Sequence, residues 1–206
     1  MNLDQLPLGV TTQLMKGPKL EVWVPQLRGH GNVPPHNVLQ EWNRAIREQA
    51  ETLVRSQGYP GEGDTEVSGY YELKTNERSV LSLSQFNYAY TKGAAHGLTV
   101  QKSLTFDAKT GRPVSLADVF KPGVDYSKRL SAIVQQQIKW RQMTLLVEFP
   151  GVRPDQDFYI ADKSLVLYYQ LYEITAYAFG FAYFPISVYE LADIVAEDGA
   201  LGRMMY

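Results

Sequence analysis

The feature that most constrains the fold is a long strand-forming tract between two amphipathic helical segments. Within residues 67–106, apolar residues recur at every second position over several runs, such as 67–73, which is typical of half-buried β-strands. Turn-forming residues near Asn76 and at 91–97 divide the tract into successive strands. Strands that are grouped between helices, rather than alternating with them, predict an α+β fold with a mostly antiparallel sheet.

Two details of the strand pattern need a structural explanation. Residues 80–90 change phase midway, since Leu81 and Leu83 share one face whereas Phe86 lies on the other. Such a change requires a β-bulge or a strand that is covered on both faces. Upstream, residues 19–27 alternate loosely and contain Pro25, which suits an edge strand or the end of a strand.

Two longer helices are expected to pack on the sheet. The first follows a Gly/Pro-rich loop, with Asn37 as its expected cap and Gly58 marking its end, and its apolar positions repeat with a 3.6-residue period. The second is expected over residues 125–143, with Trp140 among its inward side chains. Ser115 and Asp118 are spaced as in a capping box, which predicts a short helical turn.

The last third of the chain is predicted as a hairpin followed by an aromatic segment and a short closing helix. The hairpin pairs residues 158–161 with 165–170, and Ser187 is expected to cap the closing helix. Half of the 14 tyrosines fall in this region, and alternating strand faces cannot all point into one core. We therefore expect part of the cluster to form an exposed aromatic patch.

Composition excludes several classes of function. The 206 residues include no cysteine, so thiol catalysis, disulfide frameworks and Cys-ligated metals are excluded. A formal charge of -2 gives no electrostatic case for binding nucleic acid. The longest apolar tract, Ile174 to Ile186, is too short to span a membrane, and residues 1–7 lack the pattern of a signal peptide.

No pattern in the sequence predicts catalysis. The chain has no Gly-x-Ser-x-Gly elbow, no His-Glu-x-x-His, no phosphate-binding loop and no dinucleotide fingerprint, so we expect no cofactor. His30 and His36, with five residues between them, have a spacing that suits metal chelation, but further ligands do not cluster there and we expect no metal site. His96 lies among small residues, where it acts either as a general base or ligand contact, or as a structural lock for the bend; we favour the lock.

Several motifs resemble those of one bacterial extracytoplasmic family. They are Tyr90-Thr91-Lys92-Gly93-Ala94-Ala95-His96-Gly97, Phe106-Asp107-x-x-Thr110-Gly111, Leu116-x-Asp118-Val119-Phe120, Glu173-Ile174-x-x-Tyr177-x-x-Gly180 and Phe184-Pro185-Ile186. The family is the domain of unknown function found in the anti-sigma-V factor that acts as a lysozyme receptor, and in the N-terminal region of some peptidoglycan deacetylases. The resemblance covers roughly residues 19–195, and Ala94 stands where the family has a second glycine.

The resemblance implies a non-catalytic binding or sensing module of the cell envelope whose ligand is a lysozyme-like protein or peptidoglycan. It implies an extracytoplasmic location, with a cytoplasmic one as the alternative. It also implies a small leading α+β subdomain over residues 1–78 and a larger α+β domain over 79–206, the two sharing one core.

We expect ligand or partner contacts at positions of the motifs and the aromatic cluster: Tyr90, Gly93, His96, Tyr172, Glu173, Tyr177 and Phe179. Two alternatives stay open. One is a hydrolase that uses His96 as general base, and the other is a structural domain whose aromatic patch closes a homodimer. The oligomeric state is left open.

Overall fold

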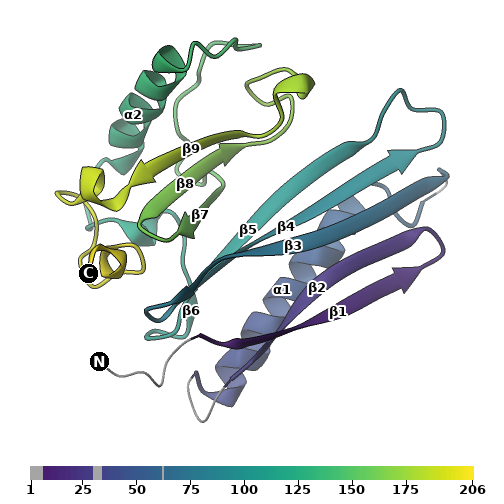
Figure 1. Cartoon of the computed structure of the whole chain (residues 1–206), viewed down its shortest axis with the longest axis horizontal. Coiled ribbons are helices and arrows are strands. Elements are labelled where there is room, and N and C mark those ends of the chain that lie inside the picture. The colour runs from purple at the N-terminus through teal and green to yellow at the C-terminus, as the bar shows by residue number, and fades with distance from the viewer. Residues whose placement is uncertain (1–6, 30–33, 62) are drawn as a thin grey trace. The chain divides into compact units, whose positions relative to one another are not determined.

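The computed structural model describes residues 7–29, 34–61 and 63–206 (Figure 1). The chain forms two compact units, Met1–Pro113 and Val114–Tyr206. The expected domain boundary at 78/79 falls at the turn between two paired strands of the first unit, so the structural division comes later in the chain. The expectation of one shared core stays a prediction.

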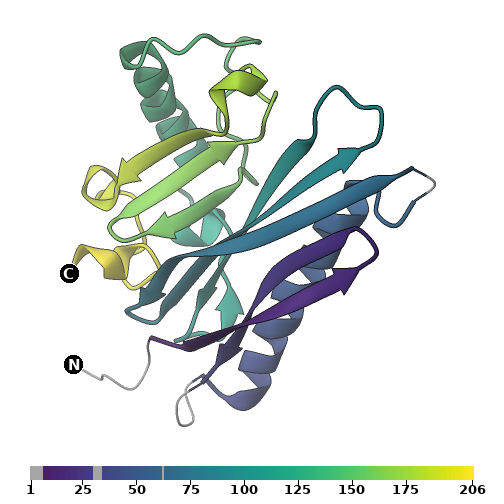
Figure 2. The ribbon, with the colours of Figure 1, turned by 45° about the vertical axis from the view of Figure 1, so that its right-hand side comes forward.

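The first unit is a six-stranded sheet with one long helix on one face, as Figure 2 shows. The strands follow the order of the chain: β1 (Gly9–Gly17), β2 (Leu20–Arg28), β3 (Thr65–Glu77), β4 (Val80–Thr91), β5 (Leu98–Asp107) and β6 (Arg112–Pro113). All neighbours are antiparallel except β2 and β3, which pair in parallel over three residues. The helix α1 (His36–Ser56) supplies the crossover that a parallel pair requires.

The periodicity expected for α1 is confirmed. Its buried side chains recur at helical spacing and pack with the apolar face of the sheet: Leu39, Trp42, Ile46, Ala50, Leu53 and Val54. Trp42 stacks on Phe106 with ring centroids 4.8 Å apart, and its indole N–H donates to the carbonyl of Gly111 at 3.1 Å. The helix begins one residue before the expected cap, with Pro35 at the N-cap and no side-chain cap. Trp42 thus fixes α1 against the C-terminal end of β5.

The structure adds a strand that the sequence analysis did not predict, and it explains Pro25 and the phase change in β4. Strand β1 was not predicted, because its exposed residues carry little apolar alternation. Since β1 pairs with β2 over nine residues, β2 is an internal strand. Pro25 is tolerated there because it lies beyond the last β2–β3 pair, Val22 with Gly69. The phase change in β4 reflects burial on both faces of its first eight residues, and the bulge lies in β3 between Leu73 and Thr75.

The second unit contains a three-stranded antiparallel sheet and one helix. The strands β7 (Phe158–Ala161), β8 (Ser164–Tyr169) and β9 (Ala182–Ser187) follow the order of the chain, which confirms the predicted hairpin. The helix α2 (Tyr126–Trp140) begins after Asp125, whose carboxylate caps it by accepting from the Lys128 N–H at 3.0 Å. The side-chain amide of Gln137 donates to the Pro185 carbonyl at 2.8 Å and so ties α2 to β9.

The inward position expected for Trp140 is wrong. Leu130, Ile133, Val134 and Ile138 form the buried side of α2, whereas Trp140 is 82% exposed. Two residues beyond Ile138 correspond to about 200° of helical rotation, so Trp140 lies on the solvent side.

The short turns of the second unit agree with the sequence. Ser115 and Asp118 form the expected capping box around the 3-10 turn η2 (Ala117–Val119), with the Ser115 N–H donating to Asp118 at 2.8 Å. The closing segment consists of the 3-10 turns η4 (Val188–Leu191) and η5 (Gly202–Met205), and Ser187 caps the first. The α+β class with a mostly antiparallel arrangement is confirmed. No helix in the described part of the chain is both long and apolar enough to cross a membrane.

Candidate functional site

The motif around His96 forms an exposed turn between β4 and β5. His96 is exposed, and its ring Nδ1 lies 2.8 Å from the carbonyl oxygen of the next residue, Gly97. Gly93 has a φ of +92°, a conformation that favours glycine, and Tyr90 is half-buried near the end of β4. The contact to Gly97 fits the structural interpretation of His96, and its use as a general base stays a prediction.

Gly97 has a steric role that explains the glycine at the end of this motif. A Cβ atom added at Gly97 would lie 2.3 Å from Cζ of Tyr88, far inside van der Waals contact. The ring of Tyr88 therefore lies directly over the Gly97 backbone. The motif positions an aromatic ring of β4 on the sheet.

The second group of candidate residues forms an exposed aromatic turn in the second unit. Tyr172 has a φ of +66° and is 49% exposed, and its ring centroid lies 5.5 Å from that of Tyr177. Phe179, in the 3-10 turn η3 (Tyr177–Phe179), is 46% exposed, and Gly180 ends that turn with a φ of +80°. Three of the expected contact residues therefore lie in the segment between β8 and β9, and the rings of Tyr172 and Tyr177 are in contact.

Glu173 fixes this turn from inside. One carboxylate oxygen accepts from the backbone N–H of Gln170 at 2.7 Å, and the other forms an ion pair with Arg153. The hydrogen bond to Glu173 raises the pKa of the Arg153 guanidinium, so this guanidinium keeps its charge. Glu173 thus joins the loop before β7 to the turn after β8.

The tyrosine-rich region divides between core and surface. Tyr168 and Tyr169 are fully buried, and burial raises the pKa of the Tyr169 phenol, with the Glu173 charge adding to the effect. Tyr172 and Tyr189 are about half exposed. The candidate residues Tyr90, Gly93 and His96 belong to the first unit, whereas those on the aromatic turn belong to the second.

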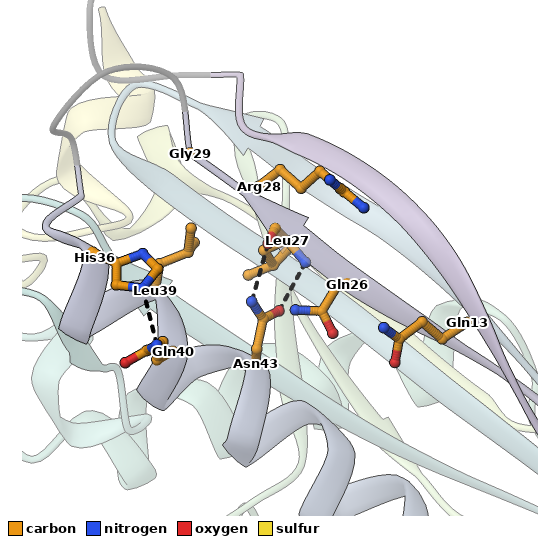
Figure 3. A pocket seen from close by; sticks show the side chains of 9 residues that line it. All are labelled: Gln13, Gln26, Leu27, Arg28, Gly29, His36, Leu39, Gln40 and Asn43. Atoms are coloured by element: carbon orange, nitrogen blue, oxygen red, sulfur yellow. Dashed lines mark hydrogen bonds between the residues drawn. The ribbon is translucent and has the colours of Figure 1, made fainter.

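A cleft in the first unit, lined by several amide side chains, was missed by the sequence analysis. Its volume is about 610 Å³, and nine residues of β1, β2, α1 and the segment after β2 line it: Gln13, Gln26, Leu27, Arg28, Gly29, His36, Leu39, Gln40 and Asn43 (Figure 3). These residues come from two consecutive strands, the segment after them and the helix that follows, and they share no motif spacing. The one sequence feature that relates to the cleft is the position of Gln26, which follows Val22 and Val24 on the helix-facing side of β2.

One wall of the cleft is held by Asn43. Its side-chain oxygen accepts from the Leu27 N–H at 2.7 Å, and its side-chain nitrogen donates to the Leu27 carbonyl at 3.0 Å. At the helix start, Nε2 of His36 lies 2.9 Å from Nε2 of Gln40. In Figure 3 the amide groups of Gln13 and Gln26 point toward one another beside this wall.

The lining consists mainly of hydrogen-bonding groups. Four of the nine residues carry amide groups, which both donate and accept, while Arg28 adds a guanidinium and His36 an imidazole. None of the nine is an aspartate, glutamate, serine or threonine, so the cleft itself offers no carboxylate and no hydroxyl nucleophile. Such a surface can bind hydroxyl, amide or carboxylate groups of a ligand.

A further feature is the distribution of side chains that could bind a metal ion. Within residues 7–29, 34–61 and 63–206, no three His, Cys, Asp or Glu side chains gather in a way that would hold a metal ion. His30, one of the two histidines weighed as a chelating pair, lies outside the described residues. His36, the other, lines the cleft.

Comparison with known proteins confirms the family resemblance for the second unit. Residues 117–189 match the family described as "Protein of unknown function (DUF3298)". The turn that contains His96 lies before this segment, in the first unit. The peptidoglycan-N-acetylmuramic acid deacetylase PdaC of Bacillus subtilis (strain 168) is 28% identical over 142 residues, which are 65% of this chain and 30% of that protein. The chain thus spans less than a third of that relative.

Two solved structures share the fold. A DUF3298 family protein from Pseudomonas aeruginosa PAO1 superposes with a TM-score of 0.62 at 18% identity, covering 96% of this chain and 98% of the other. A DUF3298 family member from Bacteroides fragilis NCTC 9343 gives a TM-score of 0.59 at 14% identity, covering 96% of each chain. At these identities the likeness concerns the fold alone.

Proposed function

Because part of the chain is similar to a peptidoglycan deacetylase and residues 117–189 match the DUF3298 family, we propose that this chain is a non-catalytic binding module of the bacterial cell envelope that recognises peptidoglycan. The cleft of the first unit carries the proposal. It presents amide groups at Gln13 and Gln26 and a guanidinium at Arg28, with no carboxylate among its lining residues.

The chemistry of peptidoglycan fits this lining. Its sugars carry acetamido and hydroxyl groups, which exchange hydrogen bonds with side-chain amides, and its stem peptides carry carboxylates that an arginine binds well. Arg28 donates from Nε to Thr11 at 3.3 Å, which holds the guanidinium in place with its other N–H groups available for a ligand.

The deacetylase relative supports the same ligand class. That protein is named as a deacetylase of the N-acetylmuramic acid of peptidoglycan, and the matched part is 30% of its length. A module that accompanies such an enzyme would hold the polymer while another part of the protein performs the reaction. On this proposal the chain acts outside the cytoplasm.

The test is sedimentation of the full chain with purified insoluble peptidoglycan. We expect the wild-type protein to be retained in the pellet and the double variant Gln13→Ala, Gln26→Ala to bind about tenfold more weakly, because two ligand hydrogen bonds of roughly 0.7 kcal/mol each are lost. The matched control is Gln136→Ala, which removes an exposed amide from α2 and should leave retention unchanged.

The outcomes separate this proposal from its alternatives. Retention that is absent, or equally reduced by the control, contradicts the proposal. Binding to a lysozyme-type protein without binding to peptidoglycan would favour a protein receptor instead. Release of soluble fragments that disappears with His96→Ala would favour the hydrolase.

A further inference from the structure

A row of aromatic side chains crosses the sheet face of the first unit that points away from α1. Val22 and Val24 are buried in the core with α1, so Trp23, between them on β2, lies on the opposite face. Trp23 is 43% exposed and Tyr70 is 50% exposed. Leu14, which is paired with Trp23, and Tyr88 are exposed on the same face, and we call these four residues the ring face.

The register places three members of the ring face on adjacent strands. Leu14 pairs with Trp23, and Trp23 and Tyr70 directly follow the last pair of β2 and β3, Val22 with Gly69. Tyr70 in turn pairs with Phe86 of β4. Four adjacent strands span about 14 Å, so the row from Leu14 to Phe86 is long and one residue wide.

The exposed rings are supported from below and from the side. The ring of Tyr70 stacks on the buried Phe86 at 4.9 Å with an interplanar angle of 11°, and Lys74 Nζ lies 5.8 Å from the Phe86 centroid. Tyr88 lies on the bare backbone of Gly97. Because these rings are held by packing, little conformational entropy is lost when a ligand stacks on them.

Polar groups flank the row on the next register positions. Lys16 pairs with Glu21, Glu21 with Ser68, and Ser68 with Tyr88. These residues line a hollow of about 290 Å³ together with Lys19 and Glu66, which form an ion pair. The two lysines and two glutamates of the lining balance, and Lys19 also forms an ion pair with Asp64, so this flank has no surplus of positive charge.

We propose that the ring face binds an uncharged oligosaccharide, with sugar rings stacked on Trp23 and Tyr70 and their hydroxyl groups bonded to the flank. A sugar ring has an apolar C–H face and a polar rim, which matches a narrow aromatic row beside donors and acceptors. A protein interface normally buries about 800 Å² per partner around a broad dry core, which a row one residue wide does not offer. The balanced charge disfavours nucleic acid.

The proposal rests on the proposed function for its ligand class but uses different residues, on the opposite face of the sheet. The cleft would bind the acidic and amide-bearing parts of the polymer, whereas the ring face would bind its neutral sugar faces. Two weak contacts on one polymer give far tighter retention than either contact alone.

The test is a fluorescence titration of the full chain with soluble N-acetylglucosamine oligomers. Trp23 and Trp140 are exposed whereas Trp42 is buried, so a stacked sugar should change the Trp23 emission over a constant Trp42 background. We expect a saturable change that is lost in Trp23→Ala and unaltered in the matched control Trp140→Ala. Tyr70→Ala, which keeps Trp23 as reporter, should weaken binding at least tenfold.

The outcomes distinguish the two proposals. No saturable change, a loss in Trp140→Ala, or full affinity in Tyr70→Ala overturns the ring-face proposal. Peptidoglycan retention that depends on Gln13 and Gln26 while the oligomers leave Trp23 unaffected would leave the proposed function standing without the ring face. Oligomer binding through Trp23, together with peptidoglycan retention that does not depend on the cleft, would support the ring-face proposal and overturn the proposed role of the cleft. Binding of a protein at Trp23, without binding of any oligomer, would also overturn the ring-face proposal.

Discussion

The side-chain amide of Asn43 takes the place of a missing strand beside β2. Strands β2 and β3 are paired only as far as Val22 and Gly69, so the outward backbone groups of Leu27 have no strand neighbour on that side. Asn43 supplies both a donor and an acceptor to them, at 3.0 and 2.7 Å. Since buried backbone groups are almost always paired, we expect this contact to be needed for the stability of the first unit.

Replacement of Asn43 by alanine should cost about 2–4 kcal/mol of unfolding free energy. The change removes two hydrogen bonds and leaves the Leu27 N–H and carbonyl without partners, at about 1–2 kcal/mol each for a partly buried pair. For a chain of 206 residues, a loss of about 3 kcal/mol lowers the Tm by roughly 6–12 °C. That loss is a large share of a typical domain stability.

The measurement is urea and thermal unfolding followed by circular dichroism and by the fluorescence of the buried Trp42. Asn43→Asp keeps the size and still accepts from Leu27 N–H, but it cannot donate to the carbonyl, so its loss should lie between wild type and alanine. Asn37→Ala, in the exposed first turn of the same helix, should change stability by less than about 0.5 kcal/mol. A loss below about 0.5 kcal/mol for Asn43→Ala would refute the strand-substitute argument.

Three further outcomes follow from contacts described above. Gly97→Ala should destabilise by about 1–3 kcal/mol because the Tyr88 ring must move, and thermal unfolding checks this. The raised pKa of Tyr169 means that the folded state holds its proton longer than the unfolded chain, so stability should fall above about pH 10; Tyr169→Phe should flatten that fall in Tm measured from pH 8 to 11. Glu173→Gln should cost under about 1 kcal/mol but speed amide hydrogen exchange over residues 170–180, and unchanged exchange would show that its ion pair with Arg153 does not hold the turn.

Local sequence patterns determined most of the secondary structure. The 3.6-residue period of α1, the hairpin of β7 and β8 and the capping box at Ser115 all depend on neighbouring residues, and each was predictable for that reason. Trp140 was misplaced although its helix was predicted, because a residue at the last position of a helix is set by the rotation from Ile138 and not by its own hydrophobicity.

The sequence by itself also determined the family resemblance and the absence of cysteine chemistry, since both are properties of residue order and composition. Only the tertiary structure decided what the motif at 90–97 does, because the ring that lies on Gly97 comes from the preceding strand. Strand β1 could not be predicted from its own residues, because its alternation of apolar residues is weak and its pairing with β2 is what makes it a strand. The cleft and the ring face each combine residues from several elements. Such contacts produce no recognisable spacing of residues along the sequence.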